Sequence, residues 1–256
     1  NAFAITTADT TVAVAIDASA LTGDNTAAGS KGLAIGATTF ATGSVVTGSA
    51  LIDSVILDAG SEGVTLNLGA GADAITADVA TLVADGTTDV TFNGGAGSDT
   101  VTVTNATITM TDNHFTNISN MEKLVLTSTT GDLSLSVGTA FNVAYADGAT
   151  ITTGEFAAAK EAVINAGLST VDTSITLTMT DAVLTALEAN VITTGSGNDT
   201  ITWTGDSNTV GVTDSTSGTI VISSGAGVDT ISVVAGTLLP STGGQFLTIT
   251  GGTGAD

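Results

Sequence analysis

Short stretches in which apolar and polar residues alternate recur along this 256-residue chain. Residues 101–110 read Val-Thr-Val-Thr-Asn-Ala-Thr-Ile-Thr-Met, and residues 175–180 read Ile-Thr-Leu-Thr-Met-Thr. A period of two places every second side chain on the same face of an extended chain, so each stretch predicts a half-buried β-strand. Because such stretches are short and are separated by glycine-rich turns, the pattern predicts a β-rich protein.

Five of these turns share one motif, in which two glycines two residues apart precede an aspartate. The motif occupies residues 68–73, 94–99, 194–199, 224–229 and 251–256. In the first four copies an apolar residue stands two positions after the aspartate, and another stands nine positions before that residue. These apolar pairs are Leu66 and Ile75, Phe92 and Val101, Ile192 and Ile201, and Ile222 and Ile231. Each copy therefore predicts a strand, a tight turn and a second strand.

The composition of the motif suits calcium. Calcium takes about six to eight oxygen ligands, so backbone carbonyl groups must supplement the carboxylates. Glycine lets a turn reach positive φ and bring carbonyl oxygens inward, and the aspartate adds negative charge. The sequence therefore predicts calcium ligands from the carboxylates and backbone of these residues: Asp73, Asp99, Asp199, Asp229, Asp256, Gly69, Gly71, Gly95, Gly97, Gly195, Gly197, Gly225, Gly227, Gly252 and Gly254.

The motif resembles the calcium-binding nonapeptide GGxGxDxUx of RTX proteins, in which U is a large apolar residue. Residues 94–102 match it in full, whereas the copies at Asp73, Asp199 and Asp229 lack the first glycine. The resemblance implies that an ion lies between consecutive turns and that the U residue points into a thin apolar core.

The spacing of the motifs departs from an uninterrupted RTX roll, in which the aspartates recur every nine residues. Here the steps between aspartates are 26, 100, 30 and 27 residues. Three steps lie near three nonapeptide lengths, which predicts that the metal turns mark every third segment of a longer coil, with metal-free rungs between them. Interspersed motifs of this kind resemble RTX-type surface-layer proteins and giant adhesins of Gram-negative bacteria.

We expect an all-β fold, a parallel β-helix or β-roll-like solenoid, with an antiparallel β-sandwich carrying metal at its loops as the alternative. Residues 1–110 and 193–256 are expected to be β-rich segments with two and three metal turns. Residues 111–192 are expected to form a mixed insertion with two short helices, at 155–166 and 181–190. The whole is expected to be one elongated unit of a longer protein.

The charge of the chain restricts its partners. Twenty-five acidic residues stand against three lysines and no arginine, which gives a formal charge of −22. Nucleic acid and anionic membranes are excluded because both attract lysine and arginine. Five calcium ions would reduce the formal charge to −12, so metal binding is expected to relieve self-repulsion. Because the chain has no cysteine, metal is also the expected cross-link.

Catalytic chemistry finds little support. The single histidine, His114, stands in a polar stretch and is expected to be solvated or to cap a turn. The sequence has neither a cysteine nucleophile nor a G-x-S-x-G motif, and lacks the histidines and cysteines of a zinc site. We therefore expect no enzymatic activity.

The only proline, Pro240, is expected in a loop or at an edge.

Together these features predict a calcium-stabilised structural module of a bacterial surface layer, exported by type I secretion and located at the cell surface. A stalk module of a giant RTX adhesin is the first alternative, and an RTX domain attached to a secreted enzyme is the second. Expected partners are further copies of the chain, in a lattice or a tandem array, and cell-surface polysaccharide bound through another domain. No direct membrane insertion is expected.

Overall fold

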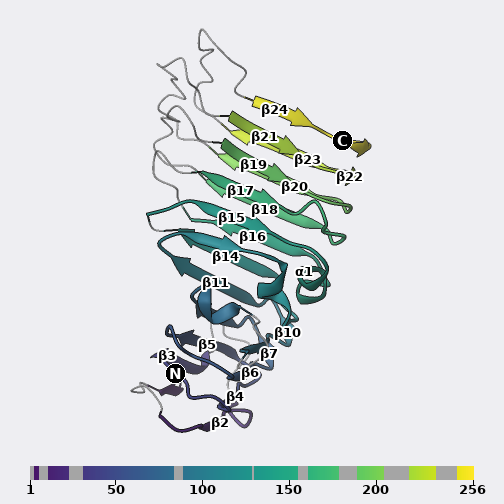
Figure 1. Cartoon of the computed structure of the whole chain (residues 1–256). Helices are drawn as coiled ribbons and strands as arrows, with labels where there is room; N and C mark the ends of the chain where they lie inside the picture. Colours follow the sequence, from purple (N-terminus) through teal and green to yellow (C-terminus); the bar gives the residue numbers. More distant parts are fainter. Residues whose placement is uncertain are drawn as a thin grey trace. The chain divides into compact units, whose positions relative to one another are not determined.

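The computed structural model describes residues 3–5, 11–22, 31–83, 89–128, 130–154, 161–178, 189–204, 219–234 and 247–256. The fold is all-β: parallel strands stack as the coils of a β-solenoid, as Figure 1 shows. Every strand pairing described is parallel, so the solenoid prediction is confirmed and the antiparallel sandwich is wrong. The chain divides into two compact units.

Unit 1 comprises Asn1–Thr104, Asn113–Val125 and Val143–Asp147. Its first sheet has the order β1 (Phe3–Ile5), β3 (Lys31–Thr38), β5 (Ile52–Leu57), β8 (Ala74–Ala77) and β11 (Thr100–Asn105, whose last residue belongs to unit 2). Its second sheet has the order β13 (Ile118–Ser119), β9 (Thr91–Asn93), β6 (Thr65–Asn67), β4 (Val45–Thr47) and β2 (Ala15–Asp17). The short strands β7 (Ala70–Gly71) and β10 (Ala96–Gly97) pair with each other.

Unit 2 comprises Asn105–Asp112, Leu126–Asn142 and Gly148–Asp256. One of its sheets has the order β12 (Ile108–Met110), β15 (Leu133–Ser136), β17 (Ala162–Asn165), β19 (Ala189–Thr193), β21 (Thr219–Ser223) and β24 (Leu247–Thr250). The other runs β16 (Ala149–Thr153), β18 (Thr173–Thr178), β20 (Thr200–Thr204) and β23 (Thr230–Val234). The short strands β22 (Ala226–Gly227) and β25 (Thr253–Gly254) pair with each other. Strand β14 (Lys123–Ser128) contains residues of both units.

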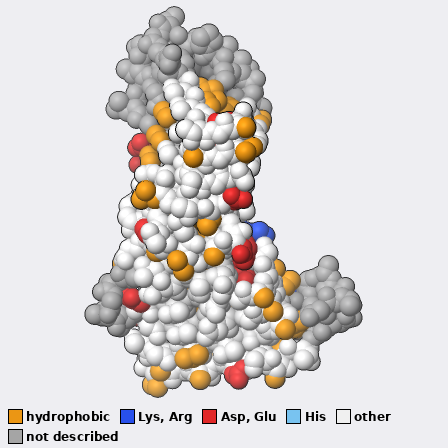
Figure 2. All heavy atoms as spheres, turned by 90° about the vertical axis from the view of Figure 1, so that its right-hand side faces the viewer, with side chains coloured by type: hydrophobic (Ala, Val, Ile, Leu, Met, Phe, Trp, Pro, Cys, Tyr) orange, Lys and Arg blue, Asp and Glu red, His pale blue; other side chains and the backbone are white. Residues whose placement is uncertain are grey.

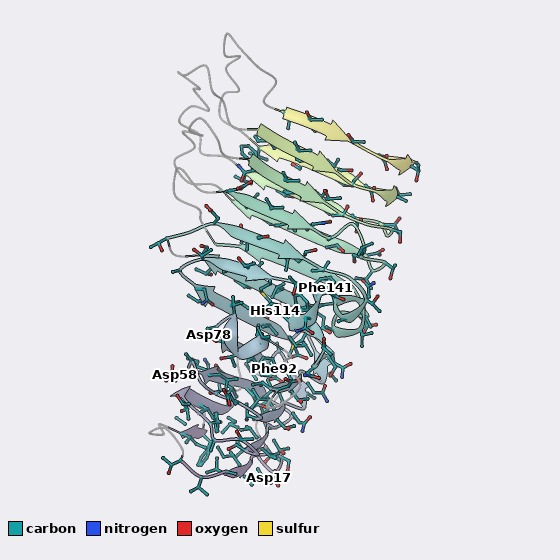
Figure 3. The ribbon with its side chains drawn as sticks, viewed as in Figure 1. Asp17, Asp58, Asp78, Phe92, His114 and Phe141 are labelled. Atoms are coloured by element: carbon teal, nitrogen blue, oxygen red, sulfur yellow. The ribbon has the colours of Figure 1, made fainter. Side chains whose placement is uncertain are left out.

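The core follows from the period of two. In unit 1, Val55, Ile75 and Val101 lie opposite one another on β5, β8 and β11, and all three are fully buried. Leu66 and Phe92 form a matching buried pair on β6 and β9, and Phe92 is labelled in Figure 3. The polar residues between them face outward and are half-buried or exposed. Each coil therefore buries its apolar side chains against those of the coils on either side.

The two predicted helices are wrong where the structure describes them. Ala162–Asn165 is strand β17, and Ala189 and Asn190 begin strand β19. The rest of both predictions, residues 155–160 and 181–188, lies outside the described residues, as does Pro240. Strand pairing and burial outweigh the helix propensity of these residues. Strand β17 pairs with both β15 and β19, and it buries Ala162 and Ile164 completely.

The helical elements that the structure does describe are short. They are the 3-10 helices η1 (Ala80–Leu82) and η2 (Asp112–Phe115) and the helix α1 (Thr139–Ala144). The carboxylate of Asp112 accepts hydrogen bonds from the backbone N–H groups of Gly138 (2.7 Å), Ala140 (3.0 Å) and Phe141 (3.0 Å), which caps α1. No sequence signal near 139 reveals this helix because its cap lies 26 to 29 residues upstream. None of the described helices is long and apolar enough to span a membrane.

His114 differs from the prediction of a solvated side chain. It lies on η2 and is buried, with 8% of its surface exposed (Figure 3). Its neighbour Phe115 packs edge-on against Tyr145, with the ring centroids 6.1 Å apart. This histidine therefore belongs to the interior of unit 1.

Truncation of Phe92 tests the packing of unit 1. Phe92→Ala removes a fully buried ring from a column of core residues and should lower the free energy of unfolding by about 3–5 kcal/mol. Val45→Ala, on the exposed face of β4, should cost less than about 1 kcal/mol. Urea unfolding followed by circular dichroism compares the two, and equal losses would contradict the burial pattern.

Candidate functional site

The glycine turns of unit 1 stack directly on one another. Ala70 pairs with Ala96 and Gly71 with Gly97, and the Ala96 N–H donates to the Gly69 carbonyl at 2.9 Å. A Cβ at Gly97, where φ is +151°, would overlap the Gly71 carbonyl oxygen. Glycine is therefore required for the turns to approach this closely.

The glycine turns of unit 2 stack in the same way. The Ala226 N–H donates to the Gly195 carbonyl at 2.8 Å, and the Thr253 N–H donates to the Gly225 carbonyl at 2.9 Å. Within each unit, consecutive motifs therefore lie on adjacent coils, and no coil without a motif separates them. The steps of 26, 30 and 27 residues each correspond to one complete coil of the solenoid, because Ile75 pairs with Val101, Ile201 with Ile231 and Ala226 with Thr253.

The aspartates of these turns point into the solenoid and form what we call the carboxylate ladder. In unit 1, Oδ1 of Asp73 accepts the Asp53 N–H at 2.8 Å, and Oδ1 of Asp99 accepts the Asp73 N–H at 2.7 Å. Oε2 of Glu122 accepts the Asp99 N–H at 2.6 Å. Each carboxylate thus caps the start of the strand in the preceding coil.

Unit 2 has a shorter ladder of the same kind. Oδ1 of Asp199 accepts the Thr173 N–H at 2.7 Å, and Oδ1 of Asp229 accepts the Asp199 N–H at 2.9 Å. Asp256, in the last described turn, is exposed. Four of the five predicted aspartates therefore occupy equivalent buried positions, two in each unit.

These four aspartates share an unusual feature, since one oxygen of each carboxylate has no partner. Oδ2 of Asp73, Asp99, Asp199 and Asp229 is buried without a hydrogen bond. The side chains themselves are at most 7% exposed. An unpaired buried carboxylate oxygen is costly, so these positions require a proton or a cation.

Burial also changes the acidity of the ladder. It raises the pKa of the Asp73 carboxyl to about 7, and repulsion by Asp53 and Asp99 adds to the rise. Burial likewise raises the pKa of Asp99 and of Asp199 above the ordinary value for aspartate. The ladder thus concentrates negative charge where it is poorly solvated. Figure 2 shows the face that lies on the right in Figure 1, where acidic side chains are few and most of the surface is uncharged.

The fit to calcium rests on the unpaired oxygens. Hard, negatively charged oxygens suit calcium, and each glycine turn adds carbonyl groups beside them. The carbonyls of Gly69, Gly195 and Gly225 each accept one N–H from the next turn, which leaves a second lone pair on each. Within the part of the chain that the structure describes, no three acidic or histidine side chains converge as a metal cluster. Calcium binding by the glycine turns stays a prediction, with one carboxylate per turn.

Sequence reasoning missed two members of the ladder, Asp53 and Glu122. Neither follows a glycine motif, and both are linked to the ladder by hydrogen bonds. The signal that could have found them is an acid two residues before a buried apolar residue, as Asp53 stands before Val55 and Glu122 before Leu124.

Comparison of the chain with models of known protein families, with curated proteins and with solved structures gave no match. The resemblance to RTX proteins therefore rests on the turn motifs themselves.

The raised pKa of Asp73 predicts how the metal-free protein responds to pH. A carboxyl with a higher pKa in the folded state stabilises the fold fully below its unfolded pKa, and this stabilisation disappears as pH rises through the folded value. For Asp73 this window runs from its ordinary value of 3.8 to about 7. In chelator, the melting temperature should therefore fall across this range, and Asp73→Asn should flatten the fall because the amide is neutral. Parallel curves for the two proteins would contradict the raised pKa.

Proposed function

We propose that this protein is a secreted, calcium-stabilised structural module of a bacterial surface layer. The observation that carries the proposal is the set of four buried aspartates, Asp73, Asp99, Asp199 and Asp229, each with one unpaired oxygen beside a stacked glycine turn. A cation held there would supply the positive charge that the described surroundings lack.

The residues that would hold calcium are these aspartates together with the carbonyl groups of the turn glycines. The bound ion would neutralise charge in the ladder and join one coil to the next. An ion that binds only the folded state stabilises it by mass action. At millimolar extracellular calcium, a site of about 0.1 mM affinity contributes on the order of 1.4 kcal/mol.

Surface location follows from the same chemistry. Extracellular calcium modules work at millimolar calcium, a concentration that the cytoplasm does not reach. Without cysteine the chain has no disulfide to stabilise it outside the cell, so metal takes that role. We propose type I secretion as its route, on the basis of the RTX-like turns.

Lateral assembly of an acidic protein needs faces on which its charge does not oppose contact. The outer face of β16, β18, β20 and β23 provides such a face in unit 2, because these strands contain no charged residue. It carries two rows of hydroxyl side chains in register, which we call the hydroxyl face: Thr150, Ser174, Thr200 and Thr230, and Thr152, Thr176, Thr202 and Ser232. All eight are half-buried or exposed. This flat, uncharged surface supports a lattice role over an isolated stalk.

Removal of one ladder carboxylate tests the calcium sites. Asp99→Ala should lower the melting temperature more in calcium than in chelator, because the variant loses both a backbone cap and a metal ligand. Asp147→Ala, at an exposed position, is the matched control and should change neither value by more than about 1 °C. Differential scanning calorimetry provides the measurement. Equal losses for Asp99→Ala with and without calcium would count against that site.

Charge on the hydroxyl face tests assembly. The double change Thr176→Asp and Thr202→Asp places two carboxylates on neighbouring strands of this face and should suppress the calcium-dependent rise in light scattering. Ser134→Asp, on the exposed side of β15, is the control and should assemble normally. A wild-type protein that gains stability in calcium yet stays monomeric would refute the lattice role and favour the adhesin stalk.

A further inference from the structure

The turn that precedes the first glycine turn of unit 1 has serine where the later turns have glycine. The Ala70 N–H donates to the Ser49 carbonyl at 3.0 Å, just as the Ala96 N–H donates to the Gly69 carbonyl at 2.9 Å. Ser49 therefore holds the position of Gly69 and Gly95 in the stack. Asp53, four residues later, holds the ladder position of Asp73 and Asp99.

Both oxygens of the Asp53 carboxylate have hydrogen-bond partners, most of which belong to this turn. Its Oδ2 accepts the Ser49 backbone N–H at 2.6 Å, and the Ser49 hydroxyl lies 3.0 Å from Oδ1 and 3.2 Å from Oδ2. Oδ1 also accepts the Leu33 N–H at 2.5 Å. Asp53 is fully buried, yet neither of its oxygens lacks a partner, in contrast to Oδ2 of Asp73 and Asp99.

Hydrogen bonding, and not the sign of φ, distinguishes the two kinds of turn. Gly69 and Gly95 adopt φ of +103° and +101°, whereas neither Ser49 nor Gly195 has a positive φ, and Oδ2 of Asp199 in the Gly195 turn is nevertheless unpaired. In the serine turn the N–H of residue 49 points at the carboxylate four residues later. No such hydrogen bond to the ladder aspartate is formed by Gly69 or Gly95, and Oδ2 stays free. The serine at this one position therefore supplies hydrogen bonds to the ladder carboxylate that the glycine turns do not supply.

Unit 2 repeats the arrangement. The Ser196 N–H donates to the Ser169 carbonyl at 2.8 Å, which places Ser169 at the position of Gly195 and Gly225. The ladder position of this turn is Thr173, whose hydroxyl lies 3.3 Å from that of Ser169 and donates to the Val171 carbonyl at 3.0 Å. This turn carries no carboxylate at the ladder position, so it needs no neutralising charge.

We infer that Ser49 and Ser169 make metal-independent turns, each placed immediately before the glycine turns of its unit, and that Ser49 determines which ladder carboxylates take calcium. The inference rests on the proposed calcium binding and names the residue that limits it. Asp53 is excluded from the calcium sites because its Ser49 contacts already occupy both oxygens. The serine turns give each stack a first coil that is formed without metal.

Replacement of Ser49 by glycine tests this inference. Ser49→Gly removes the hydroxyl and permits the positive φ of Gly69 and Gly95, so Oδ2 of Asp53 loses its partners. In EGTA the melting temperature should fall by about 5 °C. In millimolar calcium most of this loss should be recovered, and flow dialysis with calcium should count one more bound ion per chain than in the wild type.

Two control variants separate the carboxylate from the loss of serine. Ser49→Ala keeps the backbone N–H that Oδ2 of Asp53 accepts and removes only the hydroxyl, so it should lose stability equally in EGTA and calcium and gain no ion. Ser169→Gly opens the equivalent turn beside Thr173, which offers no charge, and should also gain no ion.

The outcomes distinguish the inference from the function on which it rests. An unchanged ion count for Ser49→Gly in a protein whose wild type binds calcium overturns the inference alone, as does a variant that fails to fold even in calcium. A gain of one ion in Ser169→Gly would equally overturn it. A wild-type chain that binds no calcium refutes the proposed function as well.

Discussion

The structure depends on the burial of carboxylates inside a thin apolar solenoid. The carboxylates of Asp73, Asp99 and Asp229 each accept a backbone N–H within one residue of the start of a strand in the preceding coil, and thereby help to fix the register of that strand. Parallel strands need such a marker, because a slip of one residue would turn every apolar side chain outward. The same contact confines negative charge where water does not reach it. Register and charge are therefore controlled by one set of side chains.

The two kinds of turn differ in how many hydrogen bonds each ladder carboxylate receives. A serine turn donates its own N–H and hydroxyl to Asp53, and the carboxylate is satisfied. A glycine turn packs its backbone against its neighbour but leaves one carboxylate oxygen bare. In the glycine turns the absence of a Cβ permits close stacking of the backbone. The unpaired carboxylate oxygen beside it is the group that a cation would stabilise.

On the outer surface, the feature that suits the proposed role is the distribution of charge. A net charge of −22 opposes contact between copies, so the acids are kept off the hydroxyl face of unit 2. Threonine suits this face because its branched side chain favours strands and its hydroxyl stays compatible with water. In the proposed role, metal in the turns would stiffen each module, and the hydroxyl face would pack one module beside another.

Local sequence determined several of the strands, the glycine turns and four of the ladder acids. Alternation marked β11 and β18, and the glycine motif marked Asp73, Asp99, Asp199 and Asp229, because both depend on neighbours a few residues away. Tertiary structure alone decided the rest. It made strands of residues 162–165 and 189–190 despite their helix formers, placed Asp112 at the start of α1, buried His114 and brought Asp53 and Glu122 into the ladder. These features arise from contacts between coils 20 to 30 residues apart, whose partners no local pattern identifies.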